Sequence, residues 1–290
     1  MKNIQVLTLI LFTFFYSCKN APEILSSGQV DSTEITSAIF NSPTETLISA
    51  HRGGSGLKGY PENAIETLEY LYQKDIKIFE IDIIQTKDNQ LMLLHDDFLE
   101  RTTTGQGKIK NFTADDLLKY NLVDDFGNST DYKIPYLKDV FQWAQNKDVY
   151  LMIDFKKSVK YEKVIDLIQE YSLLNKCVLI SYNVQQAEKL HKLSPESLLS
   201  VSARNMQELD WMLNTKIPTE KMVAFTGTKL SSDELYKKLN ELKIPAILGT
   251  LGNLDKRAAA RGDHLYKTWK DLGIQIIATD RPLEAYNALK

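Results

Sequence analysis

Short apolar runs alternate with amphipathic stretches along most of the chain, and this alternation is the strongest constraint on its fold. Nine runs have the β-branched and aliphatic composition of buried strands, and they lie at residues 46–50, 78–84, 91–95, 149–155, 177–182, 198–203, 222–227, 246–250 and 274–279. Helical periodicity separates most of them, for example at residues 161–174 and 184–193. Strands that alternate with helices form a parallel sheet, so the chain is predicted to be an α/β protein.

The second and third runs depart from this alternation. Only the six residues QTKDNQ connect them, whereas a parallel crossover needs about a dozen residues or more. We therefore expect an antiparallel hairpin with its turn centred on Asp88 and Asn89, which would bring His95 roughly opposite Asp82. Eight parallel strands then remain, the number that closes a TIM (β/α)₈ barrel.

The barrel domain is expected to span residues 44–290. Residues 97–147 are long for a simple crossover and contain a polar, glycine-containing stretch, which predicts an insertion at about residues 97–135, over the mouth of the barrel. Residues 61–74 have helical periodicity with Pro61 in a position that suits the first turn. Residues 256–272 are also expected to be helical.

The N-terminal residues have the pattern of an export signal. Lys2 precedes an apolar run from Ile4 to Tyr16 that is too short for a comfortable membrane span, so residues 1–17 are predicted to be a signal peptide. The run ends in a sequence that resembles a bacterial lipoprotein cleavage site, with Cys18 as the lipidated residue. Residues 18–43 would then form a flexible tether. An ordinary signal peptide that contains a cysteine is the alternative.

These features predict an exported, membrane-anchored lipoprotein of the bacterial cell envelope, in the periplasm or at the cell surface. The net charge of −3 argues against a nucleic-acid partner, which normally requires a basic patch. The second cysteine, Cys177, lies in an apolar run and is expected to be a buried, inert thiol. The sequence does not indicate an oligomeric state.

Carboxylates mark two of the predicted strands. Glu80 and Asp82 are two positions apart in an apolar run, so both point to the same side of the strand. Their repulsion in a low-dielectric interior requires a cation or hydrogen bonds. A divalent metal such as Ca²⁺ or Mg²⁺ fits, and nearby lysine and backbone groups are the alternative. Asp154 and Lys156 have the same spacing and could add a third ligand and a phosphate-binding ammonium, or form a structural ion pair.

Two of the four histidines lie at strand ends. His51 directly follows the first strand and precedes Arg52, and His95 ends the third run. Because active sites of barrels lie at the carboxyl ends of the strands, these histidines fit an acid and base pair around an anion. His191 and His264 lie in lysine-rich helical stretches and are expected to be on the surface.

Together these motifs resemble a known family. The segments are AHRGG at residues 50–54, YPENAIET at 60–67, FEIDIIQTKDNQLMLLHDDFLERTT at 79–103, MIDFK at 152–156 and IIATDRP at 276–282. They resemble the glycerophosphodiester phosphodiesterase family, within the phospholipase-C-like phosphodiesterases. The resemblance covers nearly all of the predicted barrel domain, and the motifs are highly specific as a set.

The resemblance implies roles for individual residues. It implies acid and base catalysis by His51 and His95, metal binding by Glu80 and Asp82, phosphate contact by Arg52, and a place in the same site for Lys156. The family usually has glutamate where this chain has Asp154, one methylene shorter, which leaves direct ligation or ligation through a water open.

The activity expected from the resemblance is hydrolysis of a glycerophosphodiester to glycerol 3-phosphate and an alcohol, with one divalent metal ion. Attack by a glycerol hydroxyl through a cyclic phosphate and direct attack by water both remain open. One alternative is a phosphodiesterase that acts on lysophospholipid or glycerophosphoinositol. Another is a non-catalytic binding barrel, which predicts the loss of a histidine or carboxylate, and none is lost.

Overall fold

The computed structural model describes residues 46–290. Its strands lie within the predicted runs or extend them by one residue, and they are β1 (Leu47–Ala50), β2 (Ile78–Gln85), β3 (Leu91–Leu93), β4 (Tyr150–Phe155), β5 (Cys177–Ile180), β6 (Leu198–Ser202), β7 (Met222–Phe225), β8 (Ala246–Gly249) and β9 (Ile276–Thr279). The predicted signal peptide, the tether and Cys18 lie outside the described residues.

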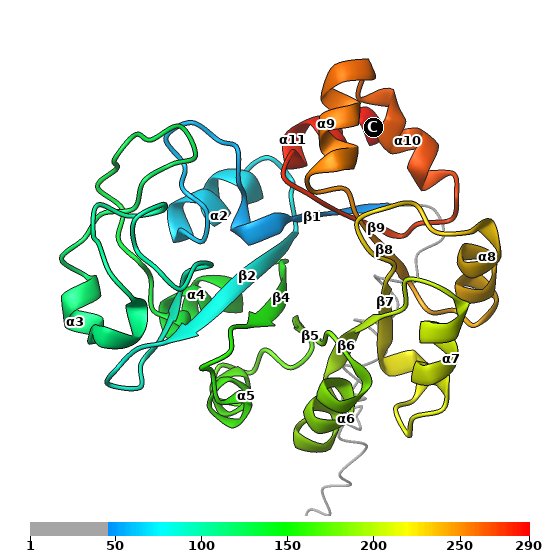
Figure 1. Ribbon diagram of the computed structural model, residues 1–290, viewed down its shortest axis with the longest axis horizontal. Coiled ribbons are helices and arrows are strands. Elements are labelled where there is room, and N and C mark those ends of the chain that lie inside the picture. Colours follow the sequence, from blue (N-terminus) through cyan, green and yellow to red (C-terminus); the bar gives the residue numbers. More distant parts are fainter. Residues whose placement is uncertain (1–45) are drawn as a thin grey trace, which may run out of the picture. The chain divides into compact units, whose positions relative to one another are not determined.

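Eight of the strands form a closed parallel barrel in the order β1, β9, β8, β7, β6, β5, β4, β2, because β2 also pairs with β1. Figure 1 shows this ring with the helices around its outside. The ninth strand, β3, pairs with β2 in the predicted antiparallel hairpin. The TIM-barrel prediction is therefore confirmed.

The hairpin register differs by one residue from the rough expectation. Ile83 pairs with Leu93, and the amide of Leu94 donates to the carbonyl of Asp82 at 3.0 Å. Leu94 therefore lies opposite Asp82, and His95 lies one residue beyond it, just past the end of β3. This shift places His95 beyond the last residue of β3, in the loop at the mouth of the barrel.

Helices form in each predicted stretch, with two corrections, and also outside those stretches. They are α2 (Ile65–Tyr72), α4 (Leu137–Gln145), α5 (Tyr161–Glu170), α6 (Val184–Leu193), α7 (Met206–Leu213), α8 (Asp233–Glu241), α9 (Asn253–Arg261), α10 (His264–Lys270) and α11 (Pro282–Leu289). Pro61 precedes α2 by a short loop instead of opening it. Residues 256–272 contain two helices, because Gly262 adopts a φ of 112° that ends α9.

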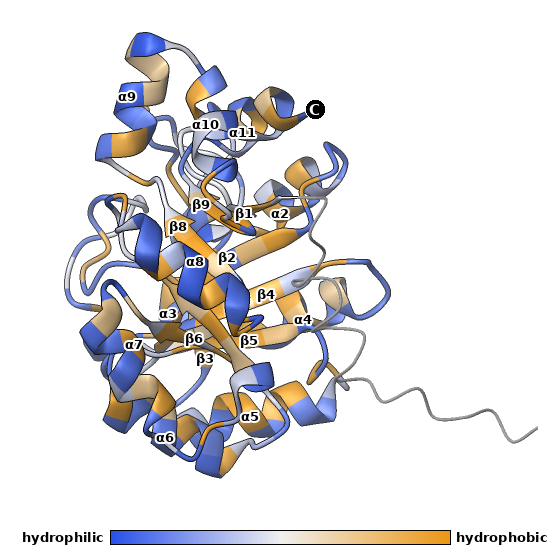
Figure 2. Cartoon of the chain, turned by 90° about the vertical axis from the view of Figure 1, so that its right-hand side faces the viewer, coloured by the Kyte–Doolittle hydropathy of each residue, from blue (hydrophilic) through white to orange (hydrophobic). Residues whose placement is uncertain are grey.

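Apolar side chains fill the barrel at its amino-terminal end. Figure 2 shows the strands as the most hydrophobic part of the fold. Alternate residues of one strand point into the barrel, so Ile78 in β2 shares its side with Glu80 and Asp82, and Met152 in β4 shares its side with Asp154. Ile78 and Met152 are buried in the apolar cluster. The carboxylates therefore lie above a packed floor, toward the carboxyl ends of the strands.

The segment between β3 and α4 forms a small unit with its own core. It contains η2 (Ile109–Asn111) and α3 (Ala114–Leu117). Its buried side chains include Leu99, Leu122 and Ile134, in a cluster separate from the main core. None of the helices in the described part of the chain has the length and apolar character needed to cross a membrane.

Candidate active site

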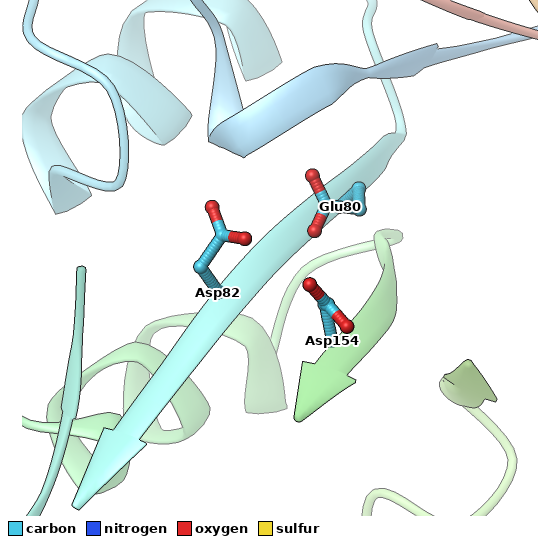
Figure 3. Close-up of side chains that lie close together, drawn as sticks. All are labelled: Glu80, Asp82 and Asp154. Atoms are coloured by element: carbon cyan, nitrogen blue, oxygen red, sulfur yellow. The ribbon is translucent and has the colours of Figure 1, made fainter. Parts of the chain in front are cut away.

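Three carboxylates meet inside the barrel near its carboxyl end. Glu80 and Asp82 come from β2 and Asp154 from the neighbouring β4, where Asp82 and Asp154 are register partners. Oxygen atoms of the three side chains lie within 4.8 Å of one another, and Figure 3 shows them pointing toward a common space. The shorter aspartate at position 154 therefore still reaches the group, and the predicted convergence of these residues is present.

The electrostatics of the carboxylates are unequal. Burial and the neighbouring charge of Asp82 raise the pKa of Glu80, and no lysine or arginine side chain within the described residues forms an ion pair with it. Burial also opposes ionisation of Asp82, but Lys156 and Asn63 outweigh this effect and lower its pKa. Ionisation of all three carboxylates together is therefore disfavoured in the protein alone, a cost that a bound cation would relieve.

Lys156 lies among the carboxylates. Its ammonium is 2.7 Å from Asp82 and 2.8 Å from Asp154, and these charges raise its pKa despite burial. The hydroxyl of Tyr182 donates to the other oxygen of Asp154 at 2.8 Å. Burial and this carboxylate raise the pKa of Tyr182, so its hydroxyl stays protonated as a donor. Lys156 and Tyr182 therefore fix the orientation of Asp154.

Asn63 holds Asp82 from the opposite side. Its side-chain amide donates to the Asp82 carboxylate at 2.7 Å, and its carbonyl accepts from the Asp82 backbone amide at 3.0 Å. Asn63 is fully buried and adopts a left-handed φ of 56°. Asparagine tolerates this conformation better than most residues, and its side chain supplies both a donor and an acceptor.

His51 lies in η1 (His51–Gly53), immediately after β1. Its Nδ1 is 2.6 Å from the carboxylate of Asp280, and its Nε2 is 4.0 Å from Glu80. Burial disfavours the charged ring, but the hydrogen bond to Asp280 and the charge of Glu80 outweigh it and raise the pKa of His51. The protein thus stabilises His51 as a proton donor whose Nε2 faces the acidic group.

Two glycines shape the turn that carries His51. A Cβ atom on Gly53 would lie 2.8 Å from Leu68, and one on Gly54 would lie 2.5 Å from Leu71. Both glycines also have positive φ angles, of 69° and 122°. The HRGG turn can therefore pack directly against α2 only without side chains at these positions.

A ring of ion pairs and hydrogen bonds joins His95 to Arg52. The Arg52 guanidinium donates to Nε2 of His95 at 3.1 Å and to Glu62 at 3.0 Å. Arg101 binds Glu62 through two bonds and Asp96 through two more. Asp96 closes the ring at 2.7 Å from Nδ1 of His95.

This ring assigns the neutral tautomer of His95. Arginine can only donate, so Nε2 of His95 accepts, and the proton lies on Nδ1, which donates to Asp96. One nitrogen of Arg52, Nε, is buried without a hydrogen-bond partner among the described residues. The site therefore holds an unprotonated imidazole nitrogen beside a guanidinium with an unsatisfied buried donor.

The structure brings together every site residue that the sequence predicted within the described part of the chain: His51, Arg52, Glu80, Asp82, His95, Asp154 and Lys156. Lys156 forms the ion pair with Asp154 that was the structural alternative, and it also contacts Asp82. The two remaining histidines lie elsewhere, with His264 exposed and His191 half-buried in α6.

Sequence reasoning missed the residues that hold these groups in place: Glu62, Asn63, Asp96, Arg101, Tyr182 and Asp280. The proline before Glu62 and Asn63 places both residues in a predicted helix, where no site role is expected. Asp280 directly follows β9, the same kind of strand-end position that identified His51. A search of every strand end for carboxylates would have found it.

Comparison with known proteins decides the family. The sequence profile of the glycerophosphoryl diester phosphodiesterase family matches residues 51–282, which includes all of these site residues. The chain belongs to this family. The resemblance in the sequence motifs is thereby confirmed.

Individual relatives agree with this assignment. A glycerophosphodiester phosphodiesterase of Caldanaerobacter subterraneus is 32% identical over 157 residues, a match that covers 52% of this chain and 64% of that protein. A crystal structure of a glycerophosphoryl diester phosphodiesterase from Parabacteroides distasonis is 30% identical, with a TM-score of 0.78, and the match covers 88% of this chain and 90% of that one.

A more distant member of the fold has a bound molecule. The structure of an Oleispira antarctica phosphodiesterase, in complex with the product sn-glycerol 3-phosphate, matches with a TM-score of 0.65 at 19% identity. It covers 84% of this chain and 96% of that one. At this identity the likeness shows the shared barrel fold.

Proposed function

We propose that the protein hydrolyses glycerophosphodiesters to glycerol 3-phosphate and an alcohol. The observation that carries the proposal is the meeting of two histidines, each oriented by its own carboxylate, with Arg52 and an acidic group at the carboxyl ends of the barrel strands. Membership of the family and the glycerol 3-phosphate bound by the Oleispira protein support the substrate.

The acidic group suits one divalent cation. Glu80, Asp82 and Asp154 offer only carboxylate oxygens, which hard cations such as Ca²⁺ and Mg²⁺ prefer. Burial and the neighbouring Asp82 raise the pKa of Glu80, and a cation would favour its ionised form. When bound there, such an ion would supply electrostatic stabilisation of the phosphoryl oxygens. Asn63, Lys156 and Tyr182 would hold two of the three ligands in place.

The two histidines take opposite roles. Nε2 of His95 accepts a hydrogen bond from Arg52 in this structure, and it can take a proton from the attacking hydroxyl when substrate replaces that bond. His51, whose pKa is raised, can donate a proton to the departing oxygen. Arg52, whose guanidinium lies beside Nε2 of His95, is the proposed contact for a phosphate oxygen. Either a glycerol hydroxyl or a water can be the nucleophile in this arrangement.

We also propose that the protein is exported and anchored to the membrane through Cys18, with residues 1–17 removed. This proposal rests on the apolar run and cysteine of the N-terminal sequence. A membrane location fits an enzyme whose substrates derive from phospholipids. Residues 44–290 would form the catalytic domain.

Variants of the two histidines test the proposed chemistry. Alanine at His51 or His95 should lower kcat by about 10²- to 10⁴-fold, the usual contribution of a positioned acid or base, and leave substrate binding largely intact. The wild-type pH profile of kcat/KM should be bell-shaped, and each variant should lose one limb.

Arg52→Ala is the comparison for these profiles, because it should weaken binding and keep both limbs. The limb that reports His95 should shift without being lost, since Arg52 donates to Nε2 of His95. A His95→Ala variant with near-normal kcat and a complete bell would show that His95 is structural. The proposed mechanism would then be wrong.

A further inference from the structure

A groove runs along the outside of the barrel from the mouth. It lies between the start of α6 and the helix α7, which are side by side in Figure 1 and Figure 2, and its volume is about 510 Å³. This volume falls in the range of about 300–1,000 Å³ that is typical of small-molecule sites. Its position after β5 and β6 places it beside the acidic group.

Tyr182 connects the groove to the active site. Its hydroxyl contacts Asp154, whereas its ring lines the groove and the residue is 57% exposed. A substrate whose phosphate lies at the carboxylates would therefore meet this ring first as it extends outward. Trp211 lies further along the same groove and is 53% exposed. Two aromatic residues this exposed, facing one hollow, form an unusual apolar surface.

Most of the polar groups that line the groove are already engaged within the protein. Arg204 and Glu208 form an ion pair with each other at 2.7 Å. Asn183 caps α6 by accepting from the amide of Gln186, and Asn214 donates to a carbonyl of α7. These groups leave little reason for a charged or strongly polar ligand to bind there. Val184 and Met212 complete the apolar lining.

We propose that this groove binds an apolar alkyl group carried by the alcohol that is esterified to the substrate phosphate. The inference rests on the proposed phosphodiesterase function and names the class of its substrates. The enzyme then prefers glycerophosphodiesters with apolar alcohols over those with small polar head groups, because burial of each methylene against Tyr182 and Trp211 adds binding energy.

A series of glycerophosphoalkyl diesters from ethyl to octyl tests this proposal. Their leaving alcohols have similar basicity, so the chemical step changes little along the series. The wild-type kcat/KM should rise by up to about fourfold for each methylene that the groove buries. Trp211→Ala and Val184→Asp should flatten this dependence and keep wild-type kcat/KM for the ethyl diester. Aspartate is favourable in the first turn of α6, so the second variant should fold.

Phe126→Ala is the matched control, because Phe126 is 61% exposed but does not line the groove. It should keep the full dependence on chain length. Equal kcat/KM along the series in the wild type, or loss of the dependence in the control as well, would overturn the groove assignment. In those cases hydrolysis itself would still support the proposed function. Failure to hydrolyse any member of the series would refute both.

Discussion

Asn63→Ala should destabilise the protein strongly and impair its metal site. The variant loses a buried hydrogen bond to the Asp82 carboxylate and leaves the Asp82 amide without a partner. A bond to a charged group contributes about 1.5–3 kcal/mol, and an unsatisfied buried donor costs about 1–3 kcal/mol. Alanine in the left-handed conformation adds about 1 kcal/mol. Because these terms are not fully additive, we expect a loss of about 4 kcal/mol in the free energy of unfolding.

Asp75→Ala is the matched control for this measurement. Asp75 has a similar left-handed φ of 67° but lies exposed in the turn after α2, and its side chain forms no hydrogen bond or ion pair within the described residues. Urea unfolding should therefore show a loss of only about 1 kcal/mol for the control. Metal affinity, measured by calorimetry, should fall by about 10- to 100-fold in Asn63→Ala, because Asp82 loses its orientation. If both variants lose the same stability and metal affinity is unchanged, Asn63 does not hold Asp82 as described.

Three further changes test other parts of the account. In Asp280→Asn, His51 loses the carboxylate whose hydrogen bond and charge raise its pKa, so the alkaline limb of the kcat/KM profile should move to lower pH. Asp263→Asn removes a similarly exposed ion pair with Arg281 and should leave that limb in place. Asp82→Ala should abolish both turnover and the metal-dependent rise in melting temperature, and a rise that a chelator still reverses would exclude Asp82 as a ligand. Cys18→Ser should release the protein from membranes with its activity unchanged, and unaltered partitioning into detergent would count against lipidation.

The strands were predictable because each is a short apolar run bounded by polar residues. The hairpin followed from the length of a single connection, since six residues cannot cross a parallel sheet. Its register was predicted only to within one residue, because the turn sequence does not fix which residue is central. The break at Gly262 was missed because the flanking helices share one periodic pattern.

The groups that carry charge at strand ends were also predictable. Glu80, Asp82 and His51 stand out because polar residues within or directly after buried strands need a reason to be there. Their partners could not be derived in the same way. Glu62 and Arg101 meet only because the loop after β1 and the segment after β3 fold over the same mouth. Sequence spacing contains no information on that approach.

Release of glycerol 3-phosphate as a function of divalent metal tests the central claim most directly. Purified protein is stripped with a chelator and assayed with glycerophosphocholine and glycerophosphoethanolamine, before and after addition of Ca²⁺ or Mg²⁺. The account predicts no turnover in the stripped protein, recovery with at least one of these ions, and no recovery in Glu80→Gln. Full turnover in the stripped protein, or release of a product other than glycerol 3-phosphate, would contradict it.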